Sequence, residues 1–125
     1  MPVTLNHTIV HSGDAEAGAA FLSEILGVAA PRPFGPFVEV ELDGGMRMDY
    51  LQTDEPFVQE HYAFLVGEDD FDATFGRITE RGLTYWADPH EHEPGRINHH
   101  DGGRGVYWRS PEGHKLEIIT RPYGG

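Results

Sequence analysis

Two histidines and two carboxylates recur at matching places in the two halves of this 125-residue sequence. His7 and His61 stand 54 residues apart, and Asp49 and Glu117 stand 68 apart, each within a largely apolar, alternating segment. A charged group in such a segment is costly unless it is paired or binds a metal. Two histidines and one carboxylate on rigid strands can form a facial triad, which leaves three adjacent positions on ferrous iron open. We therefore predict a metal site; for each histidine alone, the alternative is a hydrogen-bonded structural role.

The spacing of these residues follows an internal repeat. Phe21 and Phe75 are also 54 residues apart, and Gly27 and Gly82 are 55 apart. The last strands are offset by 68, so about 13 residues are inserted late in the second copy. Two copies are too few for a solenoid. The alternative is that any two halves with this order of elements look alike, but chance would not place histidine on histidine and carboxylate on carboxylate.

The elements that must position these residues can be read from periodicity and turn signals. In the first half we predict a strand over 3–10, a helix begun by capping oxygens at 12–14 and ended by Gly27, a proline-rich connector over 30–36, and strands over 37–42 and 46–52. In the second half we predict a strand over 61–66, a helix capped by Asp69 and Asp70 and ended by Gly82, a strand over 83–88, a loop over 89–105, and a hairpin of 105–109 and 114–120 around a type I turn at 110–113.

These elements predict an α+β fold of two βαβββ modules, about 1–52 and 60–125, paired in a single domain over 1–125. We expect the mixed sheets to curve around a metal cavity. In the final hairpin, pairing of Arg109 with Lys115 would set Tyr107 opposite Glu117 on one face. There its phenol can donate a hydrogen bond to a ligand oxygen on the metal, whereas a one-residue shift would make it an ordinary core aromatic.

Three segments resemble the vicinal oxygen chelate superfamily, which includes glyoxalase I, extradiol dioxygenases, fosfomycin-resistance proteins and bleomycin-binding proteins. They are NHTIV in the first strand, EHYAFLV at the start of the second module, and GRGVYWRSPEGHKLEIIT in the last hairpin. In metal-dependent members the first-strand histidine, the fifth-strand histidine and the last-strand glutamate are ligands. The resemblance therefore implies that His7, His61 and Glu117 bind the metal.

Within the superfamily, the segments HYAFLV, YWADP and NHHDGGRGVYW are most similar to ChaP-type oxygenases of aromatic polyketide (chartreusin) biosynthesis. This resemblance implies an Fe(II)-dependent oxygenase that uses dioxygen to rearrange or cleave a polycyclic aromatic polyketide. It also implies oxygen delivery through reduced flavin, with a flavin reductase as partner. No phosphate-cradling glycine motif is present, so we expect the flavin to be a diffusible cosubstrate.

The role of Asp49 distinguishes an oxygenase from a glyoxalase-type isomerase. Glyoxalase-type isomerases place a glutamate as a fourth ligand at this repeat position, and aspartate is one methylene shorter. We expect Asp49 to act as a base that takes the proton of a phenolic substrate, with a salt bridge to Arg47 as the structural alternative. The loop 89–105 is expected to cover the open metal face, and one of its histidines, His100 or else His99, is expected to contact substrate.

The composition excludes several classes of protein. The net charge is −12, from 9 basic and 21 acidic residues, and Lys115 is the only lysine, so nucleic-acid binding is not expected. No apolar run is long enough to span a membrane and no secretory signal is seen, which predicts a cytoplasmic protein. We also expect a homodimer and a small aromatic substrate. Besides the isomerase, the alternative is a protein that sequesters a cationic drug, which the acidic charge would favour.

Overall fold

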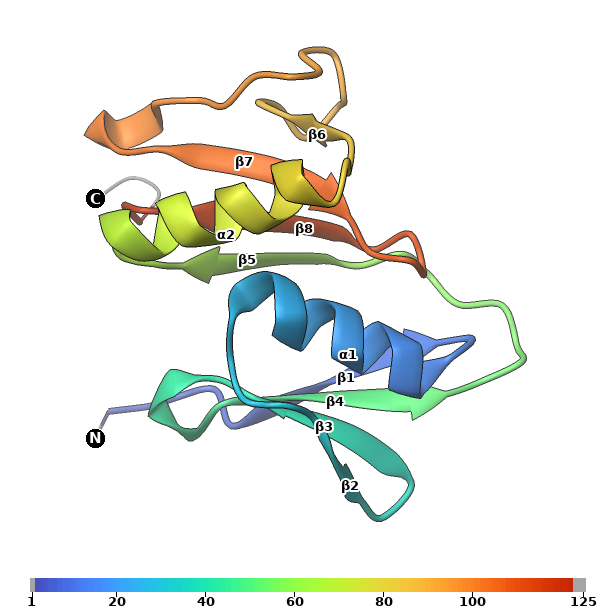
Figure 1. The fold of residues 1–125 in the computed structure, drawn as a ribbon. Helices are drawn as coiled ribbons and strands as arrows, with labels where there is room; N and C mark the ends of the chain where they lie inside the picture. The colour runs from blue at the N-terminus through green and yellow to red at the C-terminus, as the bar shows by residue number, and fades with distance from the viewer. Residues whose placement is uncertain (1, 123–125) are drawn as a thin grey trace. The chain divides into compact units, whose positions relative to one another are not determined.

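The computed structural model describes residues 2–122, and its contacts divide the chain into two compact units, one up to Val58 and one from Gln59 onward. Each unit contains one helix and one four-stranded mixed sheet (Figure 1). The order of elements in each is strand, helix and three strands, apart from short 3-10 turns. This confirms the predicted α+β class and its two βαβββ modules.

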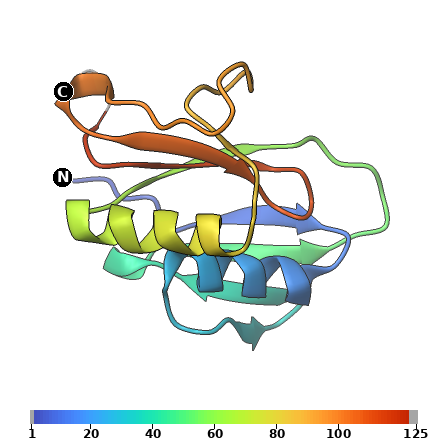
Figure 2. The ribbon, with the colours of Figure 1, turned by 45° about the horizontal axis from the view of Figure 1, so that its top comes forward.

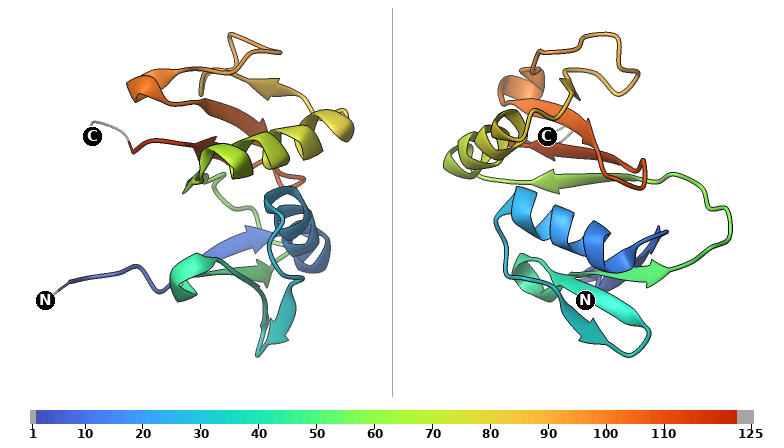
Figure 3. Two further views of the ribbon diagram at one scale, coloured as in Figure 1. Left: turned by 60° about the vertical axis from the view of Figure 1, so that its left-hand side comes forward. Right: turned by 45° about the vertical axis from the view of Figure 1, so that its right-hand side comes forward.

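The first unit carries sheet A, in the strand order β1-β4-β3-β2. Its elements are β1 (His7–Ser12), α1 (Ala15–Leu26), β2 (Arg32–Phe34), β3 (Phe37–Glu41) and β4 (Arg47–Gln52), with a 3-10 turn at Asp43–Gly45. The outer strand β1 runs parallel to β4, and the other pairs are antiparallel. Figure 3 shows the short strand β2 at the far edge of this sheet.

The helix α1 begins and ends where the side chains predict. The Asp14 carboxylate accepts the N–H of Ala17 at 3.1 Å, which satisfies one of the free amide groups of the first turn. Gly27 ends the helix with φ 71°, a left-handed conformation that glycine adopts without strain. Leu22 and Ile25 are fully buried, and α1 packs against β3 and β4. One face of sheet A is thereby covered.

The second unit carries sheet B, in the strand order β5-β8-β7-β6. Its elements are β5 (His61–Leu65), α2 (Glu68–Glu80), β6 (Tyr85–Trp86), β7 (Gly105–Arg109) and β8 (Lys115–Ile119), with a 3-10 turn at His100–Gly102. The segment between β6 and β7 projects from the sheet as an irregular loop (Figure 2). The turn after β7 closes with the Gly113 N–H donating to the Ser110 carbonyl at 2.9 Å, as predicted.

The register of the last hairpin agrees with the sequence. Arg109 pairs with Lys115, and Tyr107 pairs with Glu117. Between them, Trp108 and Leu116 point to the opposite, buried face, where Phe71 of α2 is also fully buried. Alternation along β7 and β8 therefore leaves Tyr107, Lys115 and Glu117 together on the other face of sheet B.

The two units use the same register at their centre. In sheet A, β1 pairs with β4 so that His7 lies beside Arg47. In sheet B, β5 pairs with β8 so that His61 lies beside Lys115. Two residues further on, Asp49 and Glu117 occupy equivalent places. The internal repeat is thus confirmed in the backbone pairing.

Several predicted boundaries were wrong. The first strand begins at His7 rather than residue 3, because β4 begins at Arg47, the partner of His7, and leaves exposed residues 3–5 without a strand to pair with. The connector over 30–36 contains β2, which pairs with β3 although it includes Pro33; an edge strand tolerates the missing amide. The strand over 83–88 shrinks to Tyr85–Trp86. The helix α2 starts after Gly67, so Asp69 and Asp70 lie in its first turn and do not cap it.

Among residues 2–122, neither α1 nor α2 has the length and apolar character that a membrane crossing requires.

Candidate functional site

The open face of sheet B brings two of the predicted ligands into contact. The His61 Nε2 atom lies 3.1 Å from the Glu117 Oε1 atom, across the parallel pair β5 and β8. Glu117 is fully buried, whereas the His61 side chain is 46% exposed. A buried carboxylate needs a donor or a cation close by. The imidazole nitrogen supplies one such contact, and its exposure leaves the pair accessible from one side.

Tyr107 flanks this pair. Its ring stacks on the His61 ring, with centroids 5.9 Å apart and planes inclined by 26°. Its backbone is the antiparallel partner of Glu117 on β7. Three adjacent strands therefore place an imidazole, a carboxylate and a phenol side by side, and stacking restricts the rotation of the His61 ring.

His114 supports this arrangement and was not singled out in the sequence. Its buried ring accepts the Glu60 N–H on Nδ1 at 2.9 Å, so that its proton is carried on Nε2. Glu60 is the residue before His61, and His114 precedes Lys115 on the neighbouring strand. This bond therefore fixes where β5 begins. In the sequence, His114 is seen only as the first residue of HKLEIIT. Its role could not be predicted there, because it depends on a contact with a residue 54 positions away.

The predicted residues of the first unit are arranged differently. His7 is exposed, and its Nδ1 atom lies 2.6 Å from the Asn6 Oδ1 atom. The expectation that this histidine is buried among apolar groups and needs a partner there therefore does not apply. Asp49 is buried, with 2% of its surface exposed, and its Oδ1 atom has no hydrogen-bond partner. The Arg47 Nε atom lies 3.8 Å from that oxygen, which is an ion-pair distance but not a hydrogen bond.

Arg47 is held more closely by another carboxylate. Its Nε atom lies 3.1 Å from Glu39, which is 4% exposed and also binds Arg32 at 3.0 Å. These groups border a surface cavity of about 400 Å³, together with other residues of the β2–β3 hairpin and β4. The cations on the open face of sheet A are therefore neutralised by carboxylates.

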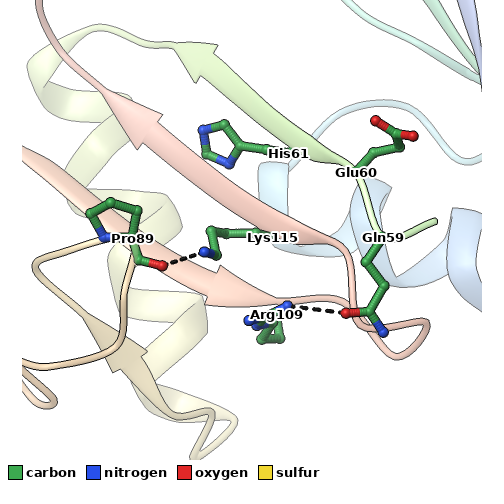
Figure 4. A pocket seen from close by; sticks show the side chains of 6 residues that line it. All are labelled: Gln59, Glu60, His61, Pro89, Arg109 and Lys115. Atoms are coloured by element: carbon green, nitrogen blue, oxygen red, sulfur yellow. Dashed lines mark hydrogen bonds between the residues drawn. The ribbon is translucent and has the colours of Figure 1, made fainter.

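A second cavity, of about 260 Å³, lies beside His61 (Figure 4). Its lining residues come from the start of β5 and the two residues before it, the end of β7, the start of β8, and the loop after β6: Gln59, Glu60, His61, Pro89, Arg109 and Lys115. The Lys115 ammonium donates to the Pro89 carbonyl, which ties the loop to the sheet. The cavity is thus an open depression with His61, the exposed member of the His61–Glu117 pair, in its lining.

The loop beside this cavity is braced by Asp88. Its Oδ1 atom accepts the N–H groups of His92 at 2.9 Å and Glu93 at 2.8 Å. Desolvation raises the pKa of Asp88, but the backbone donors outweigh it and leave that pKa below the usual value. His100 lies further along the same loop; its side chain is exposed, and its own N–H donates to Asn98.

The structure therefore joins His61, Glu117 and Tyr107, while His7 and Asp49 belong to the other unit. No cluster of three or more histidine and acidic side chains suited to holding a metal ion occurs among residues 2–122. The His61–Glu117 pair nonetheless fits a divalent metal in its chemistry, because a neutral imidazole nitrogen and a buried carboxylate are both donors that iron accepts. Of the three predicted ligands, these two lie in the same unit and in contact.

The fold and this donor pair agree with one known family. The chain belongs to the glyoxalase/bleomycin resistance protein/dioxygenase superfamily, whose model matches residues 4–118. It is similar to the solved oxidase ChaP-H1, with 59% identity over 99% of this chain and 100% of that one, and a TM-score of 0.96. It is equally similar to oxidase ChaP-H2, with 57% identity over 100% and 98% of the two chains, and a TM-score of 0.96.

A more distant relative is the glutathione transferase FosA of Serratia marcescens, 27% identical over 92% of this chain and 79% of that protein. All three relatives are named as enzymes. The two that are 57–59% identical to this chain are named oxidases. The prediction of an oxidase-type enzyme of this superfamily is thereby confirmed.

Proposed function

We propose that this protein is a ferrous-iron-dependent oxygenase that uses dioxygen to rearrange or cleave a ring of a polycyclic aromatic polyketide. The observation that carries the proposal is the His61–Glu117 pair, whose nitrogen and oxygen lie 3.1 Å apart and whose histidine lines an open cavity. The similarity to ChaP-H1 and ChaP-H2, which are named oxidases, supports an oxidative reaction.

His61 and Glu117 would hold the iron, and we propose His7 as the third ligand. This last assignment rests on the internal repeat, in which His7 occupies the place of His61. Bound ferrous iron would supply adjacent positions for a substrate oxygen and for dioxygen. The protein's own part is orientation, because burial fixes the Glu117 carboxylate and the Tyr107 ring limits the His61 imidazole.

Asp49 is proposed as the base that takes the phenolic proton of the substrate. Its Oδ1 atom is buried and accepts no hydrogen bond, so a lone pair is available for a proton. We propose that the Tyr107 phenol donates a hydrogen bond to the bound substrate and that His100, or else His99, contacts its outer edge. The exposed position of the loop histidines is compatible with this contact.

Reduced flavin is proposed as a diffusible cosubstrate, supplied by a flavin reductase. The two cavities described, of about 260 and 400 Å³, are lined largely by charged residues and contain no glycine-rich cradle for a phosphate. Transient use of flavin fits such surfaces better than tight binding.

A homodimer is proposed from the edges of the sheets. The edge strands β1 and β5 expose apolar side chains, Ile9 and Leu65 among them. Free strand edges and exposed apolar groups favour association. Sedimentation at micromolar concentration should give about twice the 13.9 kDa chain mass; a species of single-chain mass alone would contradict the dimer.

The proposed activity is tested by anaerobic metal analysis followed by oxygen-electrode measurements. Protein purified under argon should retain one ferrous ion per chain or per site. With hydroxylated polycyclic quinones, oxygen uptake should require that iron and should rise when reduced flavin is added. Iron-independent uptake, or none with any substrate tried, would count against the proposal.

The second candidate is a glyoxalase-like isomerase, and the unpartnered Asp49 oxygen is the observation that favours it. In that case Asp49 would bind zinc or nickel as a further ligand and would not act as a base. Turnover without oxygen consumption, together with zinc or nickel in the purified protein, would establish this alternative.

A further inference from the structure

Lys115 occupies the row of sheet B that contains His61. Its backbone pairs with His61 on β5 and with Arg109 on β7, so that the three side chains leave the same face. In Figure 4 the His61 ring and the Lys115 ammonium extend toward the same side of the cavity. Adjacent strands are about 4.8 Å apart, so a ligand at the His61–Glu117 pair lies within reach of the lysine.

The other cation of this row is already neutralised. The Arg109 Nε atom lies 2.6 Å from the Glu91 carboxylate, and its Nη1 atom donates to the Gly113 carbonyl at 2.7 Å. Nη1 also makes a longer contact, 3.4 Å, with Gln59. The guanidinium group therefore holds the loop and the turn in place and carries no spare charge for a ligand.

Lys115 differs because the group to which its ammonium donates, the Pro89 carbonyl, is neutral. Among residues 2–122 no carboxylate lies within 4.0 Å of its ammonium. Glu60 also lines the cavity, but its carboxylate points away from Lys115 in Figure 4. An ammonium group has three donors, and one carbonyl satisfies only one of them. The only lysine of a chain with net charge −12 thus keeps an uncompensated positive charge beside the metal-ligand pair.

We propose that Lys115 binds a carboxylate of the aromatic substrate and so determines which substrates are oriented at His61 and Glu117. One spare positive charge matches one negative charge, which favours a carboxylate over a phosphate dianion. The Pro89 ring, which also lines the cavity, offers an apolar surface for the aromatic part. This inference rests on the proposed function for the reaction, but the binding step can be measured separately.

The test compares two probes that differ only in charge, 1-hydroxy-2-naphthoate and 1-hydroxy-2-naphthamide. Binding is measured by titration calorimetry with ferrous protein under argon and again with metal-free protein. The wild type should bind the naphthoate about 10- to 100-fold more tightly than the amide, as one charge-assisted hydrogen bond predicts. Lys115→Met should remove that preference and leave amide binding unchanged, whereas Lys115→Arg should keep most of it.

Arg81→Met is the matched control, because it removes one positive charge from an exposed site at the end of α2. It should leave both affinities unchanged. Lys115→Gln serves as a second neutral variant, with circular dichroism to verify folding. Reduced flavin mononucleotide is a further probe. If Lys115→Met weakens the binding of this flavin more than the binding of the naphthoate, the lysine recognises a phosphate and the proposal is overturned.

Equal binding of the two probes by wild type, no binding of the naphthoate, or an equal loss of both probes in Lys115→Met also overturns the proposal. Failure of the proposed oxygenase would be seen differently, as a lack of iron or of oxygen uptake with the charge preference intact. The metal-free titration separates the two, since the preference is expected there as well.

Discussion

The same position of the backbone has opposite electrostatic surroundings in the two units. Arg47 in sheet A and Lys115 in sheet B both lie beside the first histidine of their module. Arg47 contacts the buried Glu39 at 3.1 Å, whereas the Lys115 ammonium donates to a neutral carbonyl and has no carboxylate within 4.0 Å among residues 2–122. The antiparallel neighbour explains this, because β3 contributes acidic residues next to Arg47 and β7 contributes Arg109 next to Lys115. One register therefore gives a neutralised network in one unit and a charged cavity in the other.

The carboxylates differ in the same way. Glu117 reaches the His61 ring, and Asp49, which is one methylene shorter, leaves its Oδ1 atom without a hydrogen bond. His7 turns to its neighbour Asn6 instead. A repeated backbone thus fixes where side chains start, and side-chain length and neighbours determine what they contact.

The largest expected effect is the loss of metal binding. Glu117→Gln and His61→Ala should each reduce iron affinity by more than about 100-fold, since even supporting residues of metal sites contribute about 10- to 100-fold. His7→Ala should do the same if the repeat position defines a ligand. Iron per chain is measured anaerobically on protein whose fold is verified by circular dichroism. Any folded variant that retains stoichiometric iron contradicts the ligand set.

The next effect concerns rate. Asp49→Asn should keep the metal but slow turnover by about 100- to 10,000-fold, the usual contribution of a general base. The deficit should shrink as pH rises toward the pKa of the substrate phenol, because an ionised phenol needs no base. Iron content and the pH–rate profile are measured on the same sample. Metal loss without recovery at high pH would instead indicate a ligand, as in the isomerase.

The comparison of Arg47 with Lys115 predicts a difference in stability. Arg47→Met should lower the free energy of unfolding by about 1–3 kcal/mol, because it removes a cation that lies 3.1 Å from the buried Glu39 carboxylate. Lys115→Met should change it by less than about 0.5 kcal/mol, as for a side chain without a charged partner. Urea denaturation gives both values. Equal losses would show that the two cations play the same role.

The smallest effects distinguish the two helices. Asp14→Ala should destabilise the first unit by about 1 kcal/mol, because it removes the side-chain cap of α1. The equivalent place before α2 is Gly67, which has no side-chain cap, and Gly67→Ser should add a few tenths of a kcal/mol. Thermal unfolding of each variant is compared with wild type. A destabilising Gly67→Ser would mean that the new hydroxyl does not reach the helix amides.

Local patterns were sufficient for much of the fold. The cap and end of α1, the turn at 110–113 and the Arg109–Lys115 register each depend on a few neighbouring residues, and each was predicted correctly. The errors occurred where a strand that is distant in the sequence determines whether a segment forms a strand. Residues 3–5 have strand composition but no partner strand, and β2 forms because β3 lies beside it.

The candidate site was only partly accessible to sequence reasoning. Alternation placed Tyr107, Lys115 and Glu117 on one face, and the repeat selected His61. The bond from Glu60 to His114 joins residues 54 positions apart, and the unpaired charge on Lys115 depends on which carboxylates do not reach it. Neither can be read from a local pattern. The metal-binding and catalytic roles themselves stay predictions.

The strand β8 is the last of its sheet to be synthesised, yet it lies between β5 and β7. On the ribosome, sheet A can complete its pairing once residue 52 has emerged, whereas sheet B lacks its second strand until β8 appears. His61 and Glu117 are 56 residues apart. At a synthesis rate of roughly 5–20 residues per second, His61 is synthesised about 3–11 s before Glu117. All strands of sheet A are therefore available well before the donor pair is complete, and that pair can form only after β8 has been synthesised.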